Sequence, residues 1–159
     1  MKVLLSSMLA IAIVGTAVTV EAKKPNPNTG VGIDLSAEKI VFKTQCKGED
    51  VCKVNNFSLT VANLGAEDIK NTRVEFYLSD DDILTTLTDE ITTVADTLIH
   101  TQSLGAMKAG KTKKRTVGGG LLKKLAPQAG QYVIGVVDAN YDIEELDEIN
   151  NIIISDPLK

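Results

Sequence analysis

The chain is poor in the residues that build most active sites and sugar-binding platforms. It has no tryptophan, three phenylalanines, three tyrosines and a single histidine, His100. A hydrolytic triad needs a histidine beside a serine or cysteine nucleophile, and no such motif accompanies His100. The scarcity of aromatic rings also removes the stacking surfaces of a glycoside-cleaving site. We therefore expect a protein that is not an enzyme.

Cysteine is also scarce, and its spacing excludes two kinds of site. The only cysteines are Cys46 and Cys52, in the polar segment Cys-Lys-Gly-Glu-Asp-Val-Cys. They are too few and wrongly spaced for a tetrahedral zinc site. They are also too close in sequence for the inter-sheet bridge of an antibody domain. In an oxidising compartment this pair predicts a disulfide that closes one short loop.

Positive charge is not in excess. The chain has 17 Lys and Arg against 21 Asp and Glu, which gives a net charge of −4 at pH 7. Duplex binding needs a basic footprint on the scale of the whole domain. The composition therefore predicts no nucleic-acid partner.

The N-terminus has the pattern of a secretory signal peptide. Lys2 precedes an apolar stretch from Val3 to Val20, and Glu21 and Ala22 follow it. One positive charge, an apolar run and small residues at the cleavage point are typical of such a peptide, so residues 1–22 are expected to be removed after Ala22. The alternative is a retained membrane anchor, since the stretch approaches the length that spans a bilayer. Cleavage predicts a periplasmic or secreted protein with no transmembrane segment left.

The remaining chain is divided into short β-type stretches by turn residues. Residues 23–32 are rich in Pro, Asn and Gly and are expected to be a flexible leader, and residues 33–159 fit one domain. Phe57, Leu59 and Val61 alternate with smaller or polar residues, which is the period of a half-buried strand. The expected strands are 35–43, 56–63, 72–79, 98–104, 111–117, 132–137 and 149–154, with one helical turn at 121–126.

Two of these strands have distinct compositions. Residues 111–117 have little apolar content and are expected at a sheet edge, whereas residues 132–137 are apolar almost throughout and are expected to be central. Short strands of this number, separated by turns, predict an all-β fold, an antiparallel immunoglobulin-like β-sandwich of about seven strands.

Two acidic segments are candidates for a calcium site. Residues 74–107 contain acids but no Lys or Arg; the acids are Glu75, Asp80, Asp81, Asp82, Asp89, Glu90 and Asp96. Residues 138–142 begin like a calcium loop, with oxygen ligands at positions one, three and five, but Ile143 stands where the loop needs glycine. The candidate calcium ligands are Asp80, Asp82, Asp138, Asn140 and Asp142. The alternative is that these residues form a solvated surface loop and cap turns.

Between Thr97 and Val137 the charge balance reverses, with basic residues and no acid. The candidate basic patch consists of Lys111, Lys113, Lys114, Arg115, Lys123 and Lys124. Such a patch would attract an acidic polysaccharide or the acidic face of another copy. The alternative is an edge strand protected by lysines against aggregation. Gly118–Gly120 precede Lys123, but a phosphate-binding loop needs Ser or Thr directly after its lysine, so a turn is expected.

Four segments share features with one known family. Phe57–Gly65 ends in an Asn-x-Gly turn, and Val74–Asp82 contains Tyr-Leu-Ser before an acidic loop. Leu125–Tyr132 has a proline followed by Gly-x-Tyr, and Val136–Ile152 carries Asp, Glu and a closing Asn-Asn. In this order they resemble the CARDB family, the cell-adhesion-related domain found in bacteria, over roughly residues 33–155. The Cys46–Cys52 loop and the long loop 80–96 depart from the family pattern.

The resemblance implies an immunoglobulin-like sandwich that serves in adhesion or display and has no agreed catalytic residues. We therefore expect an exported, non-enzymatic binding or adhesion module of the cell envelope that contacts a protein or an envelope polysaccharide. The alternative is a structural envelope protein that forms a homo-oligomer through its complementary acidic and basic segments.

Overall fold

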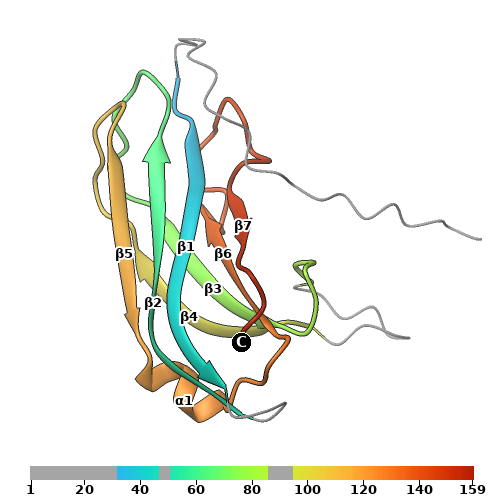
Figure 1. The fold of residues 1–159 in the computed structure, drawn as a ribbon. Helices are drawn as coiled ribbons and strands as arrows, with labels where there is room; N and C mark the ends of the chain where they lie inside the picture. The colour runs from blue at the N-terminus through green and yellow to red at the C-terminus, as the bar shows by residue number, and fades with distance from the viewer. Residues whose placement is uncertain (1–31, 47–50, 86–94) are drawn as a thin grey trace, which may run out of the picture.

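The computed structural model describes residues 32–46, 51–85 and 95–159, and these form a β-sandwich (Figure 1). One sheet has the order β1-β2-β5, with β1 Leu35–Cys46, β2 Cys52–Asn63 and β5 Thr112–Gly118. The other has the order β4-β3-β6-β7, with β4 Thr97–Ser103, β3 Arg73–Ser79, β6 Tyr132–Val137 and β7 Ile152–Ile154. A short helix, α1, spans Gly120–Leu125. Every strand pair is antiparallel, which confirms the predicted all-β sandwich.

Some predictions fall on parts of the chain that are not described. The signal peptide at 1–22, the leader up to residue 31, Asp89 and Glu90 lie outside the described residues. Within the described ranges, no helix has the length and apolar character needed to cross a membrane.

The core lies between the two sheets and follows the predicted alternation. Phe57, Leu59 and Val61 of β2 are buried, as are Val74, Phe76 and Leu78 of β3. The rings of Phe57 and Phe76 meet edge to face, with their centroids 4.9 Å apart, and so join one sheet to the other. The core is thus built from apolar side chains of both sheets.

The strand positions agree with the predictions, with three differences in length. As expected, β5 is an edge strand and β6 is central. However, β1 continues past Lys43 to Cys46 and β2 starts at Cys52 instead of Asn56, because the two strands still pair over these residues. The last strand starts at Ile152 instead of Ile149, because its pairing with β6 begins only there. Residues 149–151 still belong to the preceding loop, where Asn150 Nδ2 donates to Asp34 Oδ1 at 2.8 Å.

The two ends of the sandwich differ in structure (Figure 1). At one end, which we call the helical end, α1 lies beside the start of β2 and the end of β1. At the other end, residues 138–151 connect β6 to β7, and we call this segment the closing loop. Because β6 runs from one end to the other, the closing loop and α1 lie at opposite ends of the molecule.

Candidate binding surfaces

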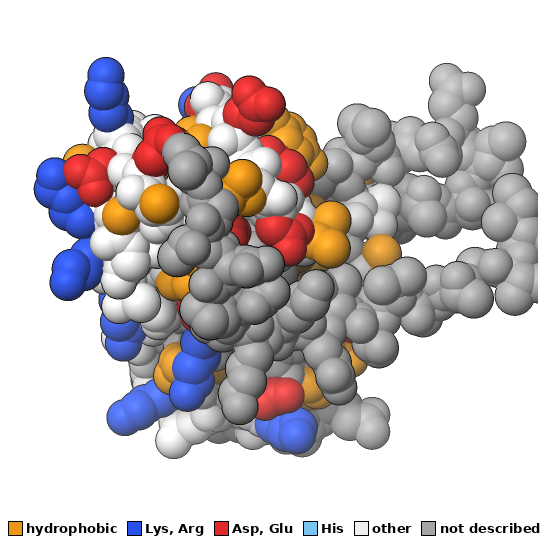
Figure 2. All heavy atoms as spheres, turned by 90° about the horizontal axis from the view of Figure 1, so that it is seen from above, with side chains coloured by type: hydrophobic (Ala, Val, Ile, Leu, Met, Phe, Trp, Pro, Cys, Tyr) orange, Lys and Arg blue, Asp and Glu red, His pale blue; other side chains and the backbone are white. Residues whose placement is uncertain are grey.

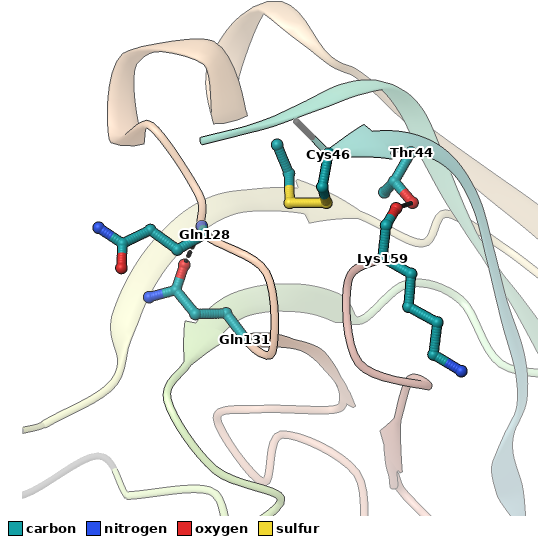
Figure 3. Close-up of a disulfide and its surroundings, with 6 residues drawn as sticks. Thr44, Cys46, Gln128, Gln131 and Lys159 are labelled. Atoms are coloured by element: carbon teal, nitrogen blue, oxygen red, sulfur yellow. Dashed lines mark hydrogen bonds between the residues drawn. A yellow bond between two sulfur atoms is a disulfide. The ribbon is translucent and has the colours of Figure 1, made fainter. Parts of the chain in front are cut away.

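A disulfide joins β1 to β2 at the helical end. Cys46 and Cys52 are partners in the β1–β2 ladder, with their Cα atoms 4.0 Å apart, which confirms the predicted bond. Figure 3 shows the C-terminal residue Lys159 close to this bond; its carbonyl oxygen accepts a hydrogen bond of 2.9 Å from Thr44 Oγ1. The disulfide and the chain end therefore hold the helical end of the sandwich together.

A surface cavity of about 510 Å³ opens beside this disulfide. The residues that line it are Val51, Cys52, Lys53, Val54, Asn55, Gly119, Gly120, Lys123 and Ala126. It exists because β5 pairs with β2 only from Asn56 onward, and after Gly118 the chain turns into α1. Among the described residues, the edge of β2 at residues 53–55 therefore has no neighbouring strand on that side.

Two backbone hydrogen bonds hold α1 around the cavity. Gly119 N donates to Asn55 O at 2.7 Å, and Cys52 N donates to Pro127 O at 2.6 Å. A Cβ at position 119 would lie 2.0 Å from Val54 O, so only glycine allows this close approach. Gly118 thus ends β5, Gly119 makes the turn and Gly120 begins α1, and this turn shapes one wall of the cavity.

The charged side chains of the cavity are both positive. Lys53 and Lys123 are exposed, and within the described part of the chain neither makes an ion pair. Val51, which is 53% exposed, adds apolar surface at the rim. The cavity therefore combines an apolar lining with two lysines that have no acidic partner among the described residues.

The residues of the predicted basic patch are not brought together. Lys113 and Arg115 stand opposite Val61 and Leu59 of β2, so they lie on the core-facing side of β5. Their side chains bond the backbone of the preceding loop: Lys113 Nζ donates to Ala106 O at 2.9 Å, and Arg115 donates to Leu104 O. These two residues thus close one edge of the sandwich.

The other four basic residues point elsewhere. Lys114 lies on the outer face of β5. Lys111 directly precedes β5, at the same end of the sandwich as the closing loop, whereas Lys123 and Lys124 lie in α1 at the helical end. Only Lys123 of the predicted six lines the cavity. The alternation of side chains along β5 already separated Lys113 from Lys114 in the sequence.

In the closing loop, Asp138 acts as an internal anchor. Its side chain is almost fully buried, and Asp138 Oδ1 accepts hydrogen bonds from Thr72 Oγ1 and, at 3.2 Å, from Asp142 N. Asp138 Oδ2 accepts from Ile143 N at 3.0 Å. Next to it, Asn140 Oδ1 accepts from Arg73 Nη1 at 3.2 Å. Asp138 and Asn140 therefore already have partners within the chain, as in the turn-capping alternative.

The candidate calcium ligands lie at two opposite ends. Ser79, which precedes Asp80, pairs with Tyr132 at the start of β6, whereas Asp138 follows the end of β6. Asp80 Oδ1 accepts from Gln131 Nε2 at 2.7 Å, and Asp82 is exposed to solvent. No group of three or more metal-ligating His, Cys, Asp or Glu occurs among the described residues. Calcium binding remains a prediction, and it would have to use one of the two segments alone.

The sequence did not reveal the role of Glu145, a half-buried carboxylate in the closing loop. It accepts hydrogen bonds from Leu35 N and, at 2.9 Å, from Asn151 Nδ2, and so ties the loop to the start of β1. Burial raises the pKa of Glu145 to about 7, and the nearby carboxylates Glu148 and Asp138 add to this rise. The Oδ1 atom of Asn151 is buried and has no hydrogen-bond partner among the described residues. The only signal in the sequence was the acidic composition of the segment.

The surface of the closing loop is both acidic and apolar. Residues 138–151 hold acids and no Lys or Arg; the acids are Asp138, Asp142, Glu144, Glu145, Asp147 and Glu148. Between them, Tyr141 and Ile149 are each 77% exposed and Leu146 is 53% exposed. Figure 2, which views this end from above, shows acidic and hydrophobic side chains side by side, with most Lys and Arg toward the left and lower edges of the view.

Comparisons with known proteins agree with this architecture. The family model CARDB matches residues 34–155. The crystal structure of the CARDB domain of PF1109 from Pyrococcus furiosus, in complex with di-metal ions, is 18% identical, with a TM-score of 0.56, and the match covers 88% of this chain and 98% of that one. This likeness supports the fold. An NMR structure of the same domain is 20% identical, with a TM-score of 0.46, over 82% of this chain and 96% of that one.

More distant matches come from larger proteins. A GH3 beta-glucosidase from Bifidobacterium adolescentis is 14% identical, with a TM-score of 0.38, over 79% of this chain but only 17% of the enzyme. The likeness is thus limited to a small part of the enzyme. No curated protein matches the chain.

Proposed function

Because the chain belongs to the CARDB family of cell-adhesion-related, non-catalytic domains, we propose that it is an exported adhesion module of the cell envelope. It contacts a protein or an envelope polysaccharide, and the contact is made at the cavity beside α1. The observation that carries this proposal is the combination, at one end of a filled sandwich, of an open cavity with Lys53 and Lys123.

The size and chemistry of the cavity fit a ligand group. Its volume of about 510 Å³ lies within the range of roughly 300–1,000 Å³ that is usual for ligand sites. Apolar walls with a few charged groups give affinity through burial and orientation through charge. The two lysines, which have no ion pair with any described residue, favour a partner that presents carboxylate or another anionic group near an apolar one.

Two features support export. Residues 1–22 have the pattern of a secretory signal peptide, with cleavage expected after Ala22. The Cys46–Cys52 bond belongs to the kind of pairing that persists in oxidising compartments outside the cytosol. Both features support a periplasmic or secreted location.

Fractionation and envelope binding together test this function. The full chain should appear in the periplasmic or medium fraction without residues 1–22, as read by intact mass. Labelled protein comprising residues 23–159 should then cosediment with washed envelopes of the organism that encodes it. Lys53→Glu/Lys123→Glu should reduce this retention several-fold.

The matched control is Lys39→Glu/Lys114→Glu, which makes the same charge change on the outer face of the three-stranded sheet. This control should be retained like the wild type. Equal retention of both double variants, or no retention of the wild type, contradicts the assignment of the cavity.

A further inference from the structure

We propose that the cavity at the helical end receives the closing loop of a second copy of this chain, so that copies join head to tail. This inference rests on the proposed function, since it names the partner of the same cavity. The two ends of one molecule are complementary: the helical end has a cavity with two lysines, and the other end has an acidic loop with exposed apolar side chains.

The closing loop offers an acidic and apolar group of suitable size. Leu146 and Ile149 are 53% and 77% exposed, and Asp147 and Glu148 lie between them. The adjacent Glu144 is exposed and adds a further charge. Two apolar side chains next to several carboxylates complement a cavity that has apolar walls and two lysines.

The loop is held in shape before any contact is made. Leu146 N donates to Ile33 O at 2.9 Å, and Glu145 N donates to Glu148 Oε1 at 3.0 Å. Ile149 N donates to Asp147 Oδ1 at 3.1 Å. Because these bonds already fix the backbone, little conformational entropy is lost on docking, which favours association through a small surface.

The charges of the cavity are not neutralised within the described part of the chain. Lys53 and Lys123 have no ion pair there, and the acidic segment Asp80–Asp82 follows β3 in the other sheet, on the opposite side of the sandwich. In contrast, the exposed Lys108 at the other end already pairs with Asp68 at 2.6 Å. No acidic group of the described residues therefore competes for the cavity lysines with one from outside.

The position of the two surfaces determines the kind of assembly. The closing loop and the cavity lie at opposite ends of one molecule (Figure 1), so a loop cannot reach the cavity of its own chain. When the loop of one copy binds the cavity of another, the resulting pair still has one free cavity and one free loop. Further copies can therefore add, and they form an open chain unless the rotation between neighbouring copies closes a ring. Salt should weaken this contact, because its charged groups are exposed.

The test uses two variants, each of which disables one surface. Lys53→Glu/Lys123→Glu disables the cavity, and Glu144→Lys/Ile149→Ser disables the loop; all four side chains are exposed, so the fold should be kept, as checked by circular dichroism and thermal melting. Sedimentation velocity of residues 23–159 at low salt, from micromolar to millimolar concentration, should show wild-type assemblies that grow with concentration. Each variant alone should remain a monomer.

The mixture of the two variants gives the sharpest result. One variant keeps an intact loop and the other keeps an intact cavity, so an equimolar mixture should form dimers and nothing larger. Lys39→Glu/Lys114→Glu should assemble like the wild type.

Three outcomes would overturn the inference: a wild type that is monomeric at all concentrations, a variant that assembles alone, or a mixture that stays monomeric. A monomeric wild type whose envelope retention still depends on Lys53 and Lys123 would leave the proposed function intact and remove only the second copy as partner. If the wild type neither self-associates nor shows envelope retention that depends on Lys53 and Lys123, both proposals are wrong.

Discussion

Replacing Glu145 with glutamine should change how the stability of the protein depends on pH. In the folded chain burial raises the pKa of Glu145 to about 7, from an ordinary value of 4.5. The folded state therefore holds the proton more tightly than the unfolded state. The stability that this gives is fully present below about pH 4.5 and is lost as the pH rises through 7.

The magnitude follows from the difference between the two pKa values. For a fully buried group this difference would correspond to about 3 kcal/mol. Because Glu145 is only half-buried, water screens part of the effect, and we expect about 1–2 kcal/mol. Glutamine has the shape of the protonated acid, and its amide can still accept from Leu35 N. If the amide of Asn151 turns over, its unpartnered Oδ1 can accept from the new NH₂ group.

Urea unfolding between pH 4.5 and pH 8.5 measures this effect. Glu145→Gln should match the wild type at pH 4.5 and exceed its free energy of unfolding by about 1–2 kcal/mol above pH 8. The control Glu144→Gln changes an exposed neighbour and should give a difference that varies little with pH. The reasoning would be refuted if the difference between Glu145→Gln and the wild type were independent of pH, or if the variant were the less stable protein at high pH.

Three further predictions concern the helical end and the acidic segments. Reducing the Cys46–Cys52 disulfide should lower the free energy of unfolding by about 2.4 kcal/mol, the chain-entropy value for a loop of about seven residues; an unchanged urea midpoint would contradict this. Gly119→Ala should cost about 1–3 kcal/mol, because its Cβ would overlap Val54 O, whereas Gly120→Ala, with open space around it, should cost nothing; equal effects in thermal melts would show that the turn can shift. Calcium at 100 times the dissociation constant of a site would add about 2.7 kcal/mol to the free energy of unfolding. In an Asp80→Asn/Asp82→Asn variant we expect no such rise in the melting temperature relative to chelator, because Asp138 and Asn140 of the other segment already have partners.

Much of the fold could be predicted from alternation along the strands. The buried positions of Phe57 and Phe76 follow directly from their place in period-two stretches, and the two cysteines had only each other as partners. The end of β1 could not be predicted, because Thr44 and Gln45 carry no apolar signal. They stay in the sheet through backbone hydrogen bonds to β2, and these depend on the partner strand rather than on their own side chains.

The candidate sites could be predicted far less well, because they depend on which segments meet at an end. Asp80 and Asp138 appeared equivalent in sequence, yet the antiparallel pairing of β3 with β6 sends them to opposite ends. The cavity arises where β5 stops and α1 begins. Nothing in the sequence around Lys53 or Gly119 shows that these two segments meet in the folded chain. Glu145 became distinct only when its carboxylate met the backbone of β1, more than a hundred residues earlier in the chain.

The placement of the disulfide also has a mechanical consequence. Gly32 lies beside the closing loop and Lys159 lies beside Thr44, so the described domain begins and ends at opposite ends of the sandwich. A tensile load applied between these two residues pulls β1 along its own axis, and the hydrogen bonds between β1 and β2 are then sheared together instead of opening one at a time. At the far end of β1, the bond from Cys46 to Cys52 prevents that strand from sliding free of β2. The strand pair that bears this load is therefore the longest of the described pairs, and it is secured at its far end by a covalent bond.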